Sequence, residues 1–199
     1  MNTVNMQPPL DQRTILAAAR SLCLDGGMSS LSMRRLAEQL GVTAGALYRH
    51  FRDKDAIVQQ LVDEANRSLG QYLKAGDTGA SARSRLLALC DAYLQFAFEQ
   101  PGYYDVLLHS TGRRDLDLLP GPTKSENFAL LLARVSDAQG ERELRSGTAV
   151  ELAISLWGLM HGLVGLYRQG RFGGDLVAFR RVYMQSLKDL LTGLREPIP

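Results

Sequence analysis

The chain has 199 residues, of which 45% are hydrophobic and 22% are charged, and its formal net charge is +2. These proportions exclude a disordered chain and provide enough apolar residues for one large domain or a small domain attached to a larger one. All of the excess positive charge lies in residues 1–60, where seven Lys or Arg accompany five Asp or Glu. An excess of this size predicts weak binding to a polyanion by a single copy of the chain.

Residues 1–12 lack the basic start and the continuous apolar run of a signal peptide, so a cytoplasmic protein is expected. Asp11 is placed to cap a first helix, which reaches about residue 25 and ends at Gly26 and Gly27. The inward face of this helix is expected to contain Ile15, Ala19, Leu22 and Cys23.

Residues 32–54, SMRRLAEQLGVTAGALYRHFRDK, predict two short helices joined by a tight turn. Gly41 follows the first helix as a C-terminal glycine, and Thr43 is placed to cap the second helix, residues 44–51, through its hydroxyl. The apolar face of the first helix consists of Leu36, Ala37 and Leu40. The inward residues of the second helix are Leu47 and Phe51.

The outer face of the second helix is small at its start and basic or aromatic afterwards. It consists of Ala44, Gly45, Tyr48, Arg49 and His50. In a helix-turn-helix the second helix enters the DNA major groove N-terminus first, and small residues there let its backbone come close to the DNA. Thr43 and the free N–H groups behind it form an anion site. Residues 32–54 also hold five Lys or Arg against two Asp or Glu, which suits DNA.

A fourth helix is predicted from its cap, Asp53, to about Ala75. Its apolar stripe is expected to contain Val58, Val62, Ala65, Leu69 and Tyr72. Lys54 places a cation at the positive end of this helix, which a nearby phosphate would explain and a solvated lysine would also allow. The turn formers of residues 76–81, GDTGAS, predict a domain boundary after the helix.

The helical pattern continues beyond this turn. A helix that stops at Gln100, before Pro101, is expected to bury Leu86, Leu89, Cys90, Tyr93, Phe96 and Ala97. A short helix is expected over residues 103–108, and LPGP at 119–122 marks a turn. A helix over residues 125–138 is expected to present Phe128, Leu131, Leu132 and Val135, with a surface loop over 139–146.

Residues 148–167 are hydrophobic nearly all round, which predicts a helix buried on both sides. A membrane span is the competing interpretation, but only the 16 residues of 152–167 are free of formal charge, and a span needs roughly 20. The last helix, residues 175–194, is also strongly apolar. These two helices and their copies are expected to form a four-helix dimer interface. The residues expected in that interface are Gly158, Gly162, Gly165, Phe179, Tyr183, Leu187 and Leu190.

Together these elements predict an all-α fold of about nine helices. Residues 1–52 are expected to form a three-helix head with the helix-turn-helix, and residues 53–199 a larger helical domain for ligand binding and dimerisation. Residues 53–75 are the long helix that connects the two.

The head resembles the N-terminal domain of TetR-family transcriptional regulators. The resemblance rests on SMRRLAEQLGV and on the positions of Leu47, Tyr48, Phe51 and Lys54. The segment WGLMHGLVGLY, residues 157–167, resembles the C-terminal domain of a subset of these regulators that carry a tryptophan followed by His-Gly. Residues 101–147 match the family only in being helical.

The resemblance implies a homodimeric transcriptional repressor that binds a palindromic double-stranded DNA operator. A small apolar or amphipathic effector would release it, through a shift of residues 53–75. Phosphate or backbone contacts are implied for Ser32, Met33, Thr43, Tyr48, His50 and Lys54, and base-reading positions at or beside Arg34, Ala44, Gly45 and Arg49. Gly45 and Ala46 replace polar or proline residues of many relatives, so side-chain readout depends on two arginines, each able to bind a guanine through O6 and N7.

An effector pocket needs apolar and aromatic walls with few polar groups. The candidates are Tyr93, Phe96, Tyr103, Tyr104, Leu107, His109, Trp157, His161 and Phe172. The alternative for each aromatic residue is ordinary core packing. The alternative for His161 is a hydrogen-bonded core histidine.

No enzyme, metal or cofactor is predicted. The three histidines, at 50, 109 and 161, lack the spacing of a metal site. The glycines of GRFGG, residues 170–174, have neither a phosphate-loop lysine nor a preceding strand. Cys23 and Cys90 are interpreted as buried reduced thiols. The alternative functions are a constitutive or architectural DNA-binding protein, or a helical small-molecule-binding protein without operator function.

Overall fold

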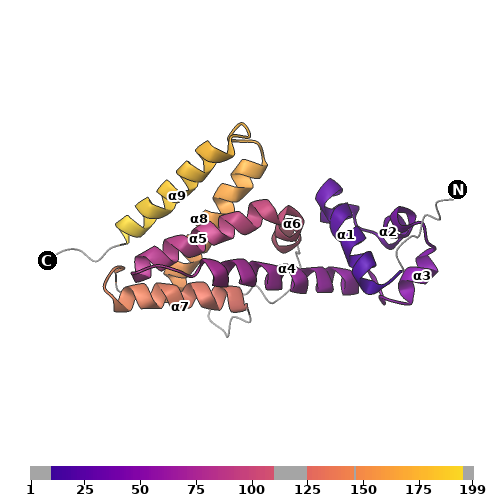
Figure 1. Cartoon of the computed structure of the whole chain (residues 1–199), viewed down its shortest axis with the longest axis horizontal. Coiled ribbons are helices and arrows are strands. Elements are labelled where there is room, and N and C mark those ends of the chain that lie inside the picture. Colours follow the sequence, from indigo (N-terminus) through magenta and orange to yellow (C-terminus); the bar gives the residue numbers. More distant parts are fainter. Residues whose placement is uncertain (1–9, 110–124, 146, 195–199) are drawn as a thin grey trace, which may run out of the picture. The chain divides into compact units, whose positions relative to one another are not determined.

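The structure is a computed structural model that describes residues 10–109, 125–145 and 147–194. Within those ranges the chain forms nine α-helices and one short 3-10 helix, and no strand, which confirms the all-α prediction (Figure 1). In chain order they are α1 (Gln12–Gly26), η1 (Met28–Ser30), α2 (Met33–Leu40), α3 (Ala44–Tyr48), α4 (Lys54–Gly76), α5 (Ala82–Glu99), α6 (Pro101–His109), α7 (Glu126–Gly140), α8 (Ala149–Arg168) and α9 (Leu176–Gly193). The turn predicted at 119–122 lies outside the described residues.

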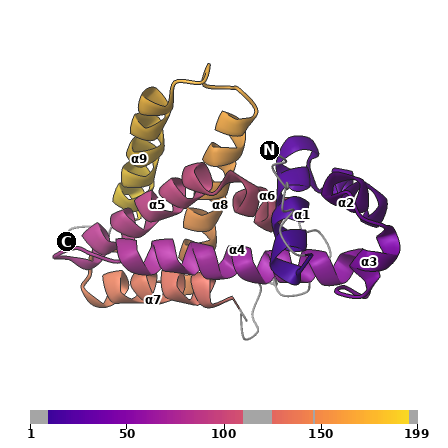
Figure 2. The ribbon, with the colours of Figure 1, turned by 45° about the vertical axis from the view of Figure 1, so that its right-hand side comes forward.

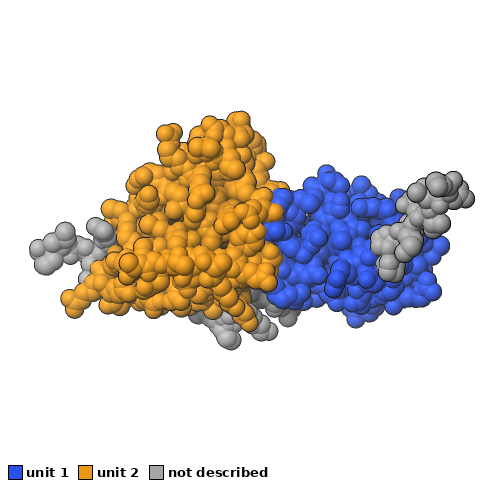
Figure 3. Space-filling view, viewed as in Figure 1, with its two compact units in different colours: residues 1–67, 100–112 blue, residues 68–99, 113–199 orange. Residues whose placement is uncertain are grey.

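The chain divides into two compact units (Figure 3). The first, which we call the head unit, comprises residues 1–67 and 100–112, and the second, the body unit, comprises residues 68–99 and 113–199. The head unit therefore contains α6, a segment from the middle of the sequence. The functional boundary expected after residue 52 is a different division and stays a prediction.

The head unit is organised around one apolar core, to which all of its α-helices contribute. The fully buried members include Ile15, Leu36, Leu47, Ile57 and Val106, from α1, α2, α3, α4 and α6 respectively. Three of its helices, α1, α3 and α4, begin at the caps that the sequence predicted. The side chains of Asp11, Thr43 and Asp53 accept hydrogen bonds from the N–H groups of Thr14 (2.7 Å), Ala46 (3.3 Å) and Ala56 (2.8 Å). Local sequence signals thus fix where these helices begin.

Two helices of the head unit differ from the predictions. α3 ends at Tyr48 rather than at Phe51. After it the chain forms a tighter turn, because the N–H of His50 bonds to the carbonyl of Leu47, three residues earlier, at 2.9 Å. Phe51 is still buried, as predicted. The row that α4 buries, at steps of four residues, is Ile57, Leu61, Ala65, Leu69 and Leu73. Val58 and Tyr72, which we expected in that stripe, are half-buried.

In the body unit, α5 is the central helix. It packs against α7, α8 and α9, and Figure 2 shows α7 and α9 on opposite sides of it. All six residues that the sequence predicted to face inward from α5 are buried: Leu86, Leu89, Cys90, Tyr93, Phe96 and Ala97. The amphipathic pattern of this helix therefore identified its core face correctly.

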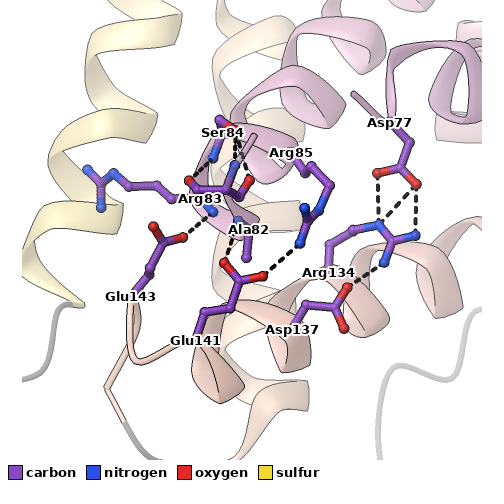
Figure 4. Close-up of polar contacts among 10 residues, drawn as sticks. Asp77, Ala82, Arg83, Ser84, Arg85, Arg134, Asp137, Glu141 and Glu143 are labelled. Carbon is purple, nitrogen blue, oxygen red and sulfur yellow. Dashed lines mark hydrogen bonds and ion pairs between the residues drawn. The ribbon is translucent and has the colours of Figure 1, made fainter. Parts of the chain in front are cut away.

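The loop of residues 76–81 does not separate the two units, because the residues on both sides of it belong to the body unit. At Gly76 a Cβ atom would lie 2.4 Å from the Cβ of Ala92, so the end of α4 packs tightly on α5. The carboxylate of Asp77 binds the guanidinium of Arg134 on α7 at 2.8 Å (Figure 4). The turn formers marked a loop correctly, but long-range contacts hold that loop inside one unit.

The N-terminus of α5 is capped by acidic side chains from the loop after α7 (Figure 4). Glu141 accepts a hydrogen bond from the N–H of Ala82 at 2.9 Å and pairs with Arg85 at 2.9 Å. Glu143 accepts one from the N–H of Arg83 at 2.5 Å. Carboxylates at this end of a helix satisfy unpaired N–H groups and favour the helix dipole.

α8 buries only one of its faces within the chain. The buried residues are Leu152, Ala153, Leu156, Met160 and Val164. Gly158 and Gly162 are exposed, so the prediction of burial on both sides is wrong for a single chain. By length and composition α8 is apolar enough to cross a membrane, a test that the core helix of a soluble protein also passes. Here α8 packs against α5, α7 and α9.

Candidate nucleic-acid interface and effector region

The helix-turn-helix of α2 and α3 is held by its turn. Gly41 has a φ of 65° and a ψ of 31°, the left-handed conformation that a glycine adopts without steric cost. The N–H of Val42 bonds to the carbonyl of Ala37 at 3.0 Å, which closes the end of α2. The sequence prediction of this turn is confirmed residue by residue.

The outer side of α3 is open to solvent. Tyr48 is 54% exposed, Gly45 and Arg49 are also exposed, and Ala44 and His50 are half-exposed. A Cβ atom built on Gly45 would meet only the Oγ1 of Thr43, at 3.9 Å, so packing within the chain does not require a glycine here. The structure therefore gathers the residues predicted for groove entry on one accessible surface. Whether they contact DNA stays a prediction.

Among the candidate DNA contacts at the start of α2, Arg34 has an acidic partner, Glu38, that the sequence analysis did not predict. Ser32 caps α2 by accepting a hydrogen bond from the N–H of Arg35 at 3.2 Å, and Met33 is half-buried beside it. The Nε of Arg34 lies 2.9 Å from a carboxylate oxygen of Glu38, and both side chains are largely exposed. An exposed pair of this kind contributes little to stability, because solvent screens it, so Arg34 is readily released to another anion. The spacing of four residues between Arg34 and Glu38 on one helix is the sequence signal that could have revealed this pair.

Lys54 is the first residue of α4 and is half-exposed. Asp53 beside it caps α4 and also pairs with Arg52 at 2.7 Å. The hydrogen bond from the N–H of Ala56, followed by that from Arg52, holds the pKa of the Asp53 carboxyl below its usual value. The start of α4 is thus fixed close to the end of α3. Lys54 therefore lies at the same end of the head unit as the candidate DNA contacts of α3.

The predicted effector residues fall into separate groups. Tyr93, Trp157 and His161 lie together in the body unit, where the Trp157 ring is centred 5.1 Å from that of His161 and 5.7 Å from that of Phe128. Phe96 is buried in the same unit, with its ring 5.7 Å from that of Tyr72. The body unit therefore contains an aromatic cluster with a tyrosine hydroxyl and an imidazole in it.

The rest of the predicted set lies elsewhere. Phe172 packs against Phe179, with ring centroids 4.9 Å apart, in the loop between α8 and α9. Tyr103, Tyr104 and Leu107 are on α6 and belong to the head unit. The side chain of His109 lies outside the described part of the chain. The expected pocket set is thus not one cluster, because α6 packs into the head core through Val106.

The hydroxyl of Tyr93 and Nδ1 of His161 are 2.8 Å apart. Burial lowers the pKa of His161 to about 4, so the imidazole is neutral near pH 7. This contact agrees with the alternative prediction for His161, a hydrogen-bonded core histidine. A neutral imidazole beside a tyrosine hydroxyl can also bind a polar group of a ligand.

The predicted dimer residues are divided between surface and core. A Cβ atom on Gly158, Gly162 or Gly165 would meet nothing within 4 Å, so the outer face of α8 is open. Three residues predicted for the interface are instead 0% exposed in the body core: Phe179, Tyr183 and Leu187. The hydroxyl of Tyr183, for example, donates to the carbonyl oxygen of Cys90 at 2.9 Å. These three side chains offer no surface to a second chain, and only Leu190 of the predicted α9 set is half-exposed.

A groove of about 590 Å³ between α5 and α9 was not predicted. Its apolar residues are Leu94, Phe98, Leu176, Val177 and Met184. Asp91 and Arg180 pair across it at 2.6 Å. No group of three or more His, Cys, Asp or Glu side chains that could hold a metal ion occurs in the described ranges.

Two family patterns match the chain. The family described as "Bacterial regulatory proteins, tetR family" matches residues 15–61, and "Tetracyclin repressor-like, C-terminal domain" matches residues 86–190. The first match covers α1 to the start of α4, and the second covers most of the body unit with α6.

Individual proteins agree with these patterns. The uncharacterised HTH-type transcriptional regulator YobS of Bacillus subtilis is 25% identical over 185 residues, which are 93% of this chain and 93% of that protein. A solved protein with unknown function from Rhodococcus sp. RHA1 has a TM-score of 0.74 at 24% identity and covers 98% of this chain and 100% of its own. The ketosteroid transcriptional regulator KstR2 of Mycobacterium tuberculosis has a TM-score of 0.68 at 20% identity, over 94% of this chain and 95% of its own. The two structures show that the fold is shared.

Proposed function

This chain belongs to the TetR family of bacterial regulatory proteins, and on that premise we propose that it is a cytoplasmic repressor that binds a palindromic operator as a homodimer and is released by a small apolar or amphipathic effector. The observation that carries the proposal is the exposed outer face of α3, with Tyr48 and Arg49 beside the small residues Ala44 and Gly45. A face of this kind suits entry into the major groove.

Readout of the DNA sequence depends on two arginines. Arg49 is exposed at the end of α3, and Arg34 is exposed on α2 with only a weak pair to Glu38. Each can donate two hydrogen bonds to O6 and N7 of a guanine. The remaining proposed contacts, Ser32, Met33, Thr43, Tyr48, His50 and Lys54, fix the position of the head on the phosphate backbone and carry no sequence information themselves.

The outer face of α8 supports the homodimer. Gly158 and Gly162 are exposed in the middle of the helix, and nothing within the chain requires a glycine at either position. A glycine in a helix interior costs about 1 kcal/mol relative to alanine, so their presence favours close approach by a second helix. Leu166 on α8 and Val182 on α9 are 43% and 38% exposed, which adds apolar surface for a partner copy. Two-fold symmetry then requires a palindromic operator.

The aromatic cluster of Tyr93, Trp157 and His161 supports an effector site in the body unit. It combines apolar walls with one hydroxyl and one neutral imidazole, which is the composition expected of a small-molecule site. An effector releases DNA only as far as it prefers the non-binding conformation, and near-complete switching takes about 5.5 kcal/mol of preference. A shift of α4, which begins in the head unit and ends in the body unit, is the proposed switch.

Footprinting on DNA upstream of the protein's own gene tests the proposal. We expect a protected palindrome with two half-sites, and the same pattern with the variant Arg181→Ala, which changes an exposed arginine of α9 outside the head. Binding without sequence preference and with a steep salt dependence would instead identify an architectural protein. Absence of any DNA binding would leave a small-molecule-binding protein without operator function.

A further inference from the structure

α6 is packed tightly into the head unit although 32 residues of the body unit, 68–99, precede it in the sequence. At Gly102 a Cβ atom would lie 3.0 Å from the Cγ atoms of both Arg20 and Leu24 on α1, so the two helices approach too closely for a larger residue. Val106 of the same helix is 0% exposed in the head core. α6 is therefore a structural part of the DNA-binding head.

Tyr103 on α6 joins three helices of the head unit. The guanidinium of Arg20 on α1 donates a hydrogen bond to the Tyr103 hydroxyl, and its Cζ lies 4.5 Å from the centre of the Tyr103 ring. The hydroxyl donates its own proton to a carboxylate oxygen of Glu64 on α4, at 3.1 Å. A tyrosine hydroxyl has one proton to donate, so its donor capacity is used within the head.

The two helices whose side chains bind Tyr103, α1 and α4, both extend to the end of α3. In the first turn of α1, the side-chain amide of Gln12 donates to the carbonyl of His50, just after α3, at 3.2 Å. α4 begins at Lys54, a few residues beyond. Arg20 lies roughly 12 Å along α1 from Gln12, and Glu64 roughly 15 Å along α4 from its start, at 1.5 Å per residue. A change in the angle between α1 and α4 at Tyr103 therefore also moves α3, which lies next to the other ends of these two helices.

We propose that Tyr103 is a positioning residue for DNA reading. Its hydroxyl fixes α1 against α4 through Arg20 and Glu64, and so sets the placement of α3 between the other ends of those helices. This role replaces the ligand contact that the sequence suggested for Tyr103. The inference rests on the proposed function, because it concerns how the same DNA-binding surface is held in place.

The variant Tyr103→Phe removes the hydroxyl and keeps the ring. Its matched control is Tyr72→Phe, because the hydroxyl of Tyr72 also donates to a glutamate, Glu99 at 2.7 Å, but within the body unit. Binding of the full-length protein is measured on the footprinted operator and on a scrambled duplex. We expect Tyr103→Phe to lose at least fivefold in operator affinity and less than twofold on scrambled DNA, and Tyr72→Phe to change neither by more than twofold.

A second pair of variants separates positioning from folding. Glu64→Gln keeps an oxygen that accepts the tyrosine proton and is expected to retain operator affinity within twofold, whereas Glu64→Ala behaves like Tyr103→Phe. Equal losses on both DNAs, or a loss in Tyr72→Phe of the same size, would overturn the inference.

Amide hydrogen exchange provides a readout that needs no DNA. We expect exchange in residues 44–51 to become faster in Tyr103→Phe and to stay unchanged in Tyr72→Phe. If the wild-type protein does not prefer the operator, the proposed function fails while this measurement still decides the positioning role. Unchanged exchange in residues 44–51 of Tyr103→Phe would overturn it.

Discussion

The hydroxyl of Tyr93 on α5 lies 2.8 Å from Nδ1 of His161 on α8, and the two rings meet edge to face with centroids 5.2 Å apart. This contact joins the central helix of the body unit to its most apolar helix. Burial of the imidazole lowers the pKa of His161 to about 4, from its ordinary value of 6.5. The contact is therefore made by a neutral histidine.

The buried histidine predicts a pH dependence of stability. Between pH 6.5 and about 4 the unfolded chain binds a proton that the folded chain does not, so the free energy of unfolding falls as the pH is lowered through this window. Urea unfolding from pH 7.5 to 4.5 measures the fall, and His161→Gln is expected to reduce it. A ring proton of His161 that titrates in NMR near its ordinary pKa would contradict the prediction.

Arg49→Ala is expected to weaken binding to the cognate operator by about 1–3 kcal/mol and to relax sequence preference at one base position. The reason is the loss of the two hydrogen bonds that we propose Arg49, an exposed side chain at the end of α3, donates to a guanine. Fluorescence anisotropy on the operator and on single-base variants measures both effects. Arg181→Ala serves as the control, and equal losses on cognate and scrambled DNA would speak against base reading by Arg49.

Gly45→Ala is expected to change stability and DNA binding in opposite directions. A Cβ atom there meets only the Oγ1 of Thr43 at 3.9 Å, and alanine is favoured over glycine in a helix by roughly 0.5–1 kcal/mol. In the proposed complex, however, the added methyl group separates the backbone of α3 from the DNA. We expect a higher unfolding midpoint and weaker operator binding, whereas Gly140→Ala, at the open end of α7, leaves binding unchanged. Operator affinity equal to wild type would show that close approach at Gly45 is not needed.

Gly162→Leu is expected to dissociate the proposed homodimer, because it places a large side chain on the open outer face of α8. Sedimentation equilibrium is expected to give twice the chain mass of 21.9 kDa for the wild type and the chain mass for the variant. Gly140→Leu is the matched control, since a Cβ atom at that exposed helical glycine also meets nothing within 4 Å. A dimeric Gly162→Leu protein would place the interface elsewhere.

Glu141→Gln is expected to reduce the loss of stability in acid. The hydrogen bond from the N–H of Ala82, and then the contact with Arg85, hold the pKa of Glu141 below its ordinary value of 4.5. Its contribution is therefore present above pH 4.5 and is lost as the pH falls through the lower folded-state value. Chemical unfolding at pH 3 to 6 compares Glu141→Gln with Glu126→Gln, an exposed glutamate at the start of α7. Identical acid profiles in the wild type and Glu141→Gln would refute this.

Local signals in the sequence predicted the local structure well. Asp11, Thr43 and Asp53 are caps, and Gly41 is left-handed, because each of these features depends on a few neighbouring residues. The exposure of the outer face of α3 followed from the same helical spacing. The sequence therefore contained most of the candidate DNA-binding surface.

Features that depend on distant residues were not predicted. Glu141 caps α5, whose first residue is 59 positions away, and no local sequence pattern predicts a contact over that distance. Phe179 and Tyr183 were assigned to a dimer surface because hydrophobic spacing identifies an apolar face of α9 without saying whether α5 or a second chain covers it. Tyr103 was assigned to a pocket by its chemistry, whereas its partners, Arg20 and Glu64, lie 83 and 39 residues away.

The incorporation of α6 in the head unit limits how this protein can be divided. A fragment that ends at residue 67 keeps the helix-turn-helix but loses Val106, which is 0% exposed in the head core, and leaves Arg20 without the Tyr103 ring. Exchange of heads between related regulators by a single crossover in α4 would join a foreign α1 to the resident α6. Recombination that preserves function therefore needs α1 and α6 to be inherited together, although 74 residues separate the end of one from the start of the other.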